Sequence, residues 1–72
     1  MATMIVSINL DNEAFGECPE VEVSRILAAL SKRVDVEGID VRLHSGRLTY
    51  RFAVPLLDIN GNWAGEARIT DA

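Results

Sequence analysis

Cysteine is nearly absent from this sequence, which has one, Cys18, among its 72 residues. A single cysteine cannot form an internal disulfide, and no Cys/His cluster offers a zinc site, so no metal or other cofactor is predicted. A chain of this length is close to the lower limit for a self-sufficient core. Such chains are usually stabilised by a disulfide, a metal or a partner subunit. We therefore expect a homo-oligomer, most simply a dimer.

Long apolar runs are missing as well. Nothing approaches the roughly 20 consecutive apolar residues that a membrane-spanning helix needs. Residues 1–10 contain no basic residue, and Ser7 and Asn9 interrupt their apolar pattern, so an export signal is not expected. A lone thiol without an export signal suits a reducing compartment. The sequence therefore predicts a cytoplasmic protein with no membrane partner.

Basic residues are absent before Arg25, whereas that part of the chain has a charge of −5. Its acidic residues are Asp11, Glu13, Glu17, Glu20 and Glu22. The rest has seven basic and six acidic side chains, so the net charge is −4, which disfavours direct nucleic-acid binding. The acidic run could instead imitate phosphates and occupy a basic groove of another protein. The alternative is that it complements a helix dipole and solvates a loop.

The composition, 49% hydrophobic and 25% charged, is typical of a folded domain. No repeat or linker divides it, so we expect one domain over residues 1–72. Alternation of apolar and polar residues from Thr3 to Leu10 predicts a half-buried strand. The segment Glu13–Glu17 is expected to be a loop, with Phe15 at the edge of the core.

A helix is predicted from Pro19 to about Val34, with Gly38 in the exit loop. Proline is favoured at the first helical position, and acidic residues follow it in the first turn. One apolar stripe with helical spacing indicates the buried face. Its members are Val23, Ile26, Leu27, Leu30 and Val34.

Two hairpins are predicted after the helix, at Ser45-Gly46 and at Asn60-Gly61. Asn-Gly between alternating runs is the strongest short-range signal for a two-residue type I′ turn. Closure at Ser45-Gly46 pairs Leu43/Leu48, Val41/Tyr50, Asp40/Arg51 and Arg42/Thr49. Closure at Asn60-Gly61 pairs Leu57/Ala64, Leu56/Gly65 and Val54/Ala67, among others.

These registers place Phe52 and Trp63 on the core face. Pro55 has no N–H to donate to the ladder, so a bulge or break is predicted at Val54-Pro55. The predicted fold is α+β with the order β-α-β-β-β, one helix packed on a mainly antiparallel four-stranded sheet. The sequence does not decide which edge of the sheet the first strand occupies.

The outer face of that sheet would carry an apolar patch near the second turn. We interpret its residues Leu57, Ile59 and Ala64 as an oligomer or partner surface. Four arginines on or near the same face could meet an anionic ligand, or could form salt bridges with Asp40 and Glu66. They are Arg42, Arg47, Arg51 and Arg68.

No motif indicates catalysis. The Asp58–Asn62 segment resembles the start of a calcium loop, but Trp63 and Ile69 occupy the positions that such a loop gives to glycine and an acid, so a hairpin turn is favoured. His44 and Ser45 are adjacent and point apart. Cys18 is surrounded by acidic residues, which favours an ordinary thiol. We expect no catalytic residue and no enzymatic activity.

Three segments together resemble a group of short, uncharacterised proteins of bacteriophages and prophages. The segments are LDNEAF (Leu10–Phe15), PEVEVSRILAAL (Pro19–Leu30) and LLDINGNWAG (Leu56–Gly65). The group is marked by an LDNxAF-like start, an ELARIL-like helix and a closing DxNGNxxG hairpin. The resemblance implies a phage accessory protein acting in the host cytoplasm, and it supplies no catalytic residues.

Two functional hypotheses follow. In the first, the chain is a non-enzymatic phage protein that binds a host protein through the acidic residues, as a defence inhibitor such as an anti-CRISPR protein does. In the second, an oligomer sequesters a small anionic nucleotide through the arginines. A structural or regulatory phage component is a third interpretation.

Overall fold

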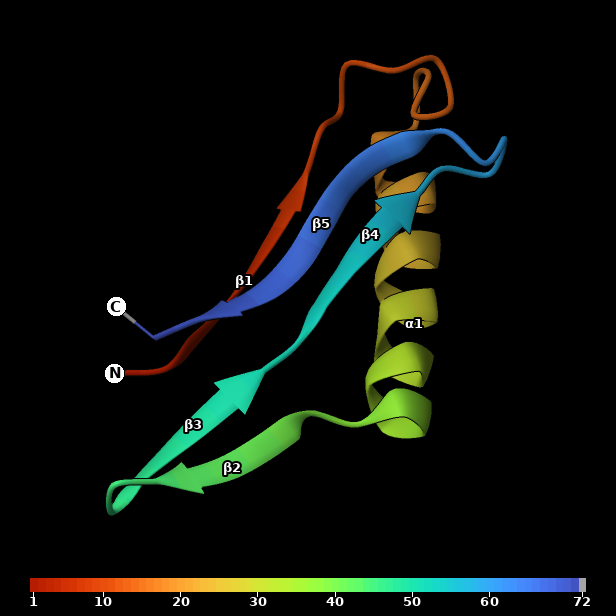
Figure 1. Cartoon of the computed structure of the whole chain (residues 1–72). Helices are drawn as coiled ribbons and strands as arrows, with labels where there is room; N and C mark the ends of the chain where they lie inside the picture. The colour runs from red at the N-terminus through yellow and green to blue at the C-terminus, as the bar shows by residue number, and fades with distance from the viewer. Residues whose placement is uncertain (72) are drawn as a thin grey trace.

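The computed structural model describes residues 1–71 and folds them into one helix and five strands (Figure 1). The elements are β1 (Thr3–Ile8), α1 (Pro19–Glu37), β2 (Asp40–His44), β3 (Arg47–Arg51), β4 (Ala53–Leu57) and β5 (Trp63–Thr70). The predicted α+β class and the antiparallel pairing are confirmed. The single four-stranded sheet is wrong, because the strands of residues 1–71 form two sheets, ordered β1-β5-β4 and β2-β3.

The second sheet arises because the long strand predicted after Arg47 is interrupted at Phe52. The Phe52 side chain packs against the core, and its carbonyl oxygen still accepts a hydrogen bond from the N–H of Ile69 at 2.9 Å. Two-stranded ribbons twist more strongly than wider sheets. The β2–β3 hairpin therefore diverges from β4 and extends away from the helix (Figure 1).

The β2–β3 hairpin itself follows the sequence prediction. Its turn is Ser45-Gly46, with φ values of 52° and 77°, the positive values that a type I′ turn requires. The observed pairs of Leu43 with Leu48 and of Val41 with Tyr50 are those expected from the sequence.

Helix α1 ends three residues later than predicted, at Glu37 rather than Val34. No helix-breaking residue precedes Gly38, whose φ is 73° and whose N–H donates to the carbonyl oxygen of Val34 at 2.9 Å. The helix lies along β4 and leaves β1 largely uncovered (Figure 1). Met4, Val6 and Leu27 are consequently exposed.

The core lies between α1 and the β4–β5 pair. Phe15 is buried there, as expected from the sequence. Its buried apolar residues are Phe15, Ile26, Leu30, Val54, Leu56, Ala64 and Ala67. The predicted core position of Trp63 is wrong, because this side chain is 61% exposed.

Trp63 faces outward because the β4–β5 loop contains three residues, not two. The N–H of Asp58 donates to the carbonyl oxygen of Asn62 at 2.8 Å, and the N–H of Gly61 donates to that of Asp58 at 3.0 Å. Only Gly61, with φ 84°, has positive φ in the loop. A β-turn closed by a left-handed glycine is the usual three-residue hairpin loop. The extra residue pairs Leu57 with Trp63 instead of Ala64.

A bulge at Ala64 then restores the predicted register. Leu57 pairs with Trp63, whereas Leu56 pairs with Gly65, so Ala64 is the additional residue of β5. Ala64 and Gly65 are both buried as a result. The predicted bulge at Val54-Pro55 is thus wrong in position.

Pro55 fits β4 without a break. Because Phe52 and Ile69 share a hydrogen bond, the alternation of an antiparallel ladder points the backbone N of Pro55 away from β5. Among residues 1–71, no strand pairs with this edge of β4, so a residue without an N–H is tolerated there.

Strand β1 pairs with β5, which settles the edge that the sequence left open. Ile8 lies opposite Gly65, and a Cβ atom added to Gly65 would lie 1.9 Å from the carbonyl oxygen of Ser7. The N–H of Asn9 donates to the carbonyl oxygen of the bulged Ala64 at 2.6 Å.

Candidate protein-binding surface

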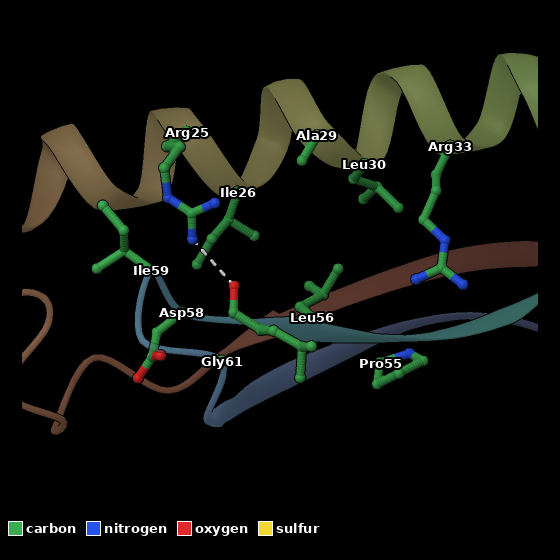
Figure 2. Close-up of a pocket in the computed structure, with 11 residues that line it drawn as sticks. Arg25, Ile26, Ala29, Leu30, Arg33, Pro55, Leu56, Asp58, Ile59 and Gly61 are labelled. Carbon is green, nitrogen blue, oxygen red and sulfur yellow. Dashed lines mark hydrogen bonds between the residues drawn. The ribbon is translucent and has the colours of Figure 1, made fainter.

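A buried polar junction fixes helix α1 to the β4–β5 loop. Glu22 is only 5% exposed; its Oε1 accepts a hydrogen bond from Nε of Arg25 at 2.6 Å, and its Oε2 accepts one from the N–H of Ile59 at 2.8 Å. Nη2 of Arg25 also donates to the carbonyl oxygen of Leu57 at 3.0 Å (Figure 2). Both residues of the ion pair therefore hold the loop backbone.

The same junction extends to the loop between β1 and α1. Oδ1 of the buried Asp58 accepts hydrogen bonds from the N–H groups of Asn60 and Asn62 at 2.8 and 2.9 Å. Its Oδ2 accepts one from Nδ2 of Asn12 at 2.6 Å. Oδ1 of Asn12 accepts one from the N–H of Ala14 at 2.7 Å. Three segments distant in sequence thus meet at one end of the molecule.

The hydrogen bonds keep both carboxylates ionised. The side chain of Arg25, followed by the N–H of Ile59, lowers the pKa of Glu22. The N–H of Asn62 is the main cause of the lowered pKa of Asp58, to which Asn12 also contributes. Glu22 in turn raises the pKa of Arg25. A general acid or base works best with a pKa near the working pH, so these groups suit a structural role.

The predicted acidic surface loses one member, because Glu22 belongs to this junction. It lies four and eight residues before Ile26 and Leu30 and extends their buried stripe, a spacing that could have revealed its burial. The other four acidic residues are exposed in the loop between β1 and α1 and in the first turn of α1: Asp11, Glu13, Glu17 and Glu20.

The predicted apolar patch of Leu57, Ile59 and Ala64 is not a single surface. Ala64 is buried in the core, which contradicts its assignment to the outer face. Leu57 faces outward opposite Trp63. Ile59 lies on the helix side of the loop, near Arg25 (Figure 2). The one-residue displacement at the loop separates these side chains, because each step along a strand changes the face.

Ile59 instead joins the acidic residues. A hollow beside it has walls that include Glu17, Val21 and Ile59, with the buried Phe15 among its lining residues. Val21 and Ile59 are 68% and 69% exposed. We call this region, with the four exposed carboxylates, the acidic end; its residues are Asp11, Glu13, Glu17, Glu20, Val21 and Ile59. Val21 is not among the surface residues predicted from the sequence. The signal for it was that Val21 is apolar but lies off the apolar stripe of the helix.

A second hollow, a groove of about 290 Å³, runs between α1 and β4. Arg25 and Arg33 line its helix side, and Pro55 lies across from them (Figure 2). Both arginines are already paired, Arg25 with Glu22 and Arg33 with Glu37. The groove therefore offers no unpaired charge to an anion.

The four arginines predicted as an alternative anion site are spread over three strands, with Arg42 on β2, Arg47 and Arg51 on β3, and Arg68 on β5. Arg42 pairs with Asp40 at 3.2 Å, and Arg68 lies 3.5 Å from a carboxylate oxygen of Glu66. These are the salt bridges considered as the alternative interpretation. Nη2 of Arg47 lies 4.0 Å from Oδ2 of Asp71.

The remaining reactive side chains lie apart from one another. Cys18 is exposed just before α1, whereas His44 and Ser45 lie at the tip of the β2–β3 hairpin. Within residues 1–71, no three His, Cys, Asp or Glu side chains are grouped to hold a metal ion. The described helix is not long and apolar enough to cross a membrane.

Comparisons with protein-family models, with curated proteins and with solved structures gave no match to this chain. The class of the protein is therefore defined by its fold: a small α+β domain in which one helix packs along one side of a three-stranded antiparallel sheet and a separate hairpin projects from it.

Proposed function

We propose that this chain is a non-enzymatic phage or prophage protein that binds a host protein through the acidic end. One observation carries the proposal: two exposed aliphatic side chains, Val21 and Ile59, share a hollow with Glu17. Protein interfaces commonly combine an apolar centre with a polar rim. The acidic end has this arrangement, with carboxylates as its rim.

The loop that carries Ile59 is held by hydrogen bonds within the fold. Ile59 is held by its N–H bond to the buried Glu22, and the neighbouring Asp58 is bonded to three different residues. Surfaces held in the bound conformation lose less entropy on association. This supports a binding role for Ile59.

The charge of the rim indicates the chemistry of the partner. Among residues 1–71, none of the four exposed carboxylates forms an ion pair with another side chain. A partner rich in Lys and Arg would complement them. We infer a basic surface, such as the nucleic-acid-binding groove of a host defence protein, and the sequence resemblance supports the phage origin.

The test is capture from a bacterial lysate, followed by binding of the purified, identified protein. Reversal of three charges, with Glu13, Glu17 and Glu20 each changed to Lys, should weaken binding on the order of tenfold or more and reduce its salt dependence. Asp35→Lys, an exposed acid elsewhere on α1, is the matched control and should bind normally.

A second variant examines the apolar centre. Ile59→Ser leaves the backbone N–H that binds Glu22 and should weaken the same complex. Nucleic acid that binds the captured protein should compete with the chain. Equal binding by the triple variant and the wild type would overturn the proposal, and a thermal shift with a cyclic nucleotide in place of any captured protein would favour the nucleotide hypothesis.

A further inference from the structure

The β2–β3 hairpin has an uncovered apolar face. Leu43 lies directly opposite Leu48, and Val41 lies opposite Tyr50, so these side chains share one face. Leu43 and Leu48 are 72% and 53% exposed, and Val41 is also exposed. The helix lies along β4 and does not reach this face (Figure 1).

A hairpin of this kind needs support. Two-stranded hairpins are at best marginally stable in water unless they pack against another element. In residues 1–71, β2 pairs with β3 alone, and neither strand joins the three-stranded sheet. Something outside the described fold is therefore expected to cover the apolar face.

The dimensions of the molecule indicate how much surface is to be covered. The radius of gyration is 14.3 Å, whereas a compact chain of this length has about 11 Å. The accessible surface is 5266 Å², against about 4,400 Å² for a compact monomer of this mass. The excess, about 900 Å², is close to the roughly 800 Å² that each partner contributes to a stable interface.

We propose that the β2–β3 hairpin is a homodimer interface, in which two copies pack their apolar hairpin faces against each other about a twofold axis. The face is aliphatic, with Tyr50 at one position, and an apolar face is complementary to itself in such an arrangement. The polar and charged residues of the hairpin lie on its opposite face and stay in water: Asp40, Arg42, His44, Arg47, Thr49 and Arg51. Pairing through strand edges would instead leave the apolar face exposed.

The packing would resemble two sheets stacked face to face, at a spacing of about 10 Å. The acidic end lies at the opposite end of the molecule, beside the start of α1 (Figure 1). Each copy in the dimer would keep that surface free. The dimer does not depend on the proposed partner binding.

Sedimentation equilibrium of the full chain tests this inference. The wild type should be a dimer, and Leu43→Lys should raise the dimer Kd at least about tenfold, as loss of a central contact does. His44→Lys adds a charge to the neighbouring residue on the opposite face and should leave the dimer unchanged. Leu57→Lys, on the outer face of the main sheet, should do the same.

Cross-linking is a second test of the same interface, and it does not depend on whether Leu43→Lys leaves the hairpin folded. In a Cys18→Ser background, Leu48→Cys should give a covalent dimer with a short bis-maleimide, whereas Arg47→Cys on the opposite face should not. A wild-type chain that stays monomeric at high micromolar concentration would overturn the inference. So would equal cross-linking of the two variants, or a dimer disrupted by Leu57→Lys and not by Leu43→Lys.

Discussion

Asn12 and Asp58 are 46 positions apart in the sequence, yet Nδ2 of Asn12 donates to Oδ2 of Asp58 at 2.6 Å. Asn12 belongs to the LDNEAF segment and Asp58 to the LLDINGNWAG segment. Glu22, from the helical segment between them, reaches the same loop through Ile59. The three segments therefore contact one another, and their polar residues build one junction.

This junction predicts a loss of stability in acid. The pKa values of Glu22 and Asp58 are lowered by folding, so the unfolded chain binds more protons as the pH falls through the carboxyl range. Their contribution should be complete above about pH 5 and should decrease at lower pH as the folded carboxylates are protonated. Urea unfolding at a series of pH values measures it.

Glu22→Gln should be less stable than the wild type at pH 7, with a weaker dependence on pH in acid. Glu17→Gln changes an exposed carboxylate of the same end and serves as the control. Identical pH profiles for Glu22→Gln and the wild type would contradict the assignment of this carboxylate.

Gly65→Ala should destabilise the fold by about 1–3 kcal/mol, the range for overpacking a well-packed site. The added Cβ would meet the carbonyl oxygen of Ser7 at 1.9 Å, so β1 has to move away from β5. Thermal unfolding and hydrogen exchange of the β1 amides measure this. Because the contact is with backbone, Ser7→Gly should not rescue the variant; rescue would show that a side chain limits the space.

The three-residue loop predicts that substitutions of Asn60 and of Gly61 have different effects on stability. Gly61→Ala should cost about 1–2 kcal/mol, the energy of a left-handed conformation for a residue with a Cβ atom. The φ of Asn60 is not positive, so the stability of Asn60→Ala should stay within about 0.5 kcal/mol of that of the wild type. Equal costs, measured by denaturant unfolding, would instead indicate a two-residue type I′ turn.

Trp63 gives an optical test of the register. It is the one tryptophan of the chain, and it lies opposite Leu57 on the outer face. Its fluorescence in the folded protein should be that of a solvent-exposed indole and should be quenched readily by iodide. Trp63→Phe should therefore cost little stability. Blue-shifted, protected emission from the isolated chain would place the indole in the core and contradict the bulge at Ala64.

The helix and most of the strands could be predicted from the sequence. The strand pairing beside the β4–β5 loop could not, for a physical reason. A three-residue loop displaces the pairing by one, and the bulge at Ala64 displaces it back, so Leu56/Gly65 and Val54/Ala67 were predicted and Leu57/Trp63 was not. Both loop types accept Asn60-Gly61, because both place Gly61 at positive φ. The local sequence could not distinguish them.

The candidate site was predicted less well, since burial depends on tertiary contacts. Glu22 resembles its acidic neighbours in sequence, but Arg25 and the N–H of Ile59 compensate its charge inside the fold. The break at Phe52 is also invisible in the alternating pattern, which continues across it. Sequence alone therefore gave a continuous sheet and a larger acidic surface.

Pro55 and Arg25 together have a consequence for solubility. The backbone groups of Ala53, Pro55 and Leu57 point to the free edge of β4, the edge at which a foreign strand could be added. Pro55 has no donor there, and the carbonyl oxygen of Leu57 is already bonded to Arg25. Exposed strand edges are common starting points for aggregation, and proline or charge beside them is a natural protection. This edge therefore offers a foreign strand fewer backbone partners than an ordinary strand edge does.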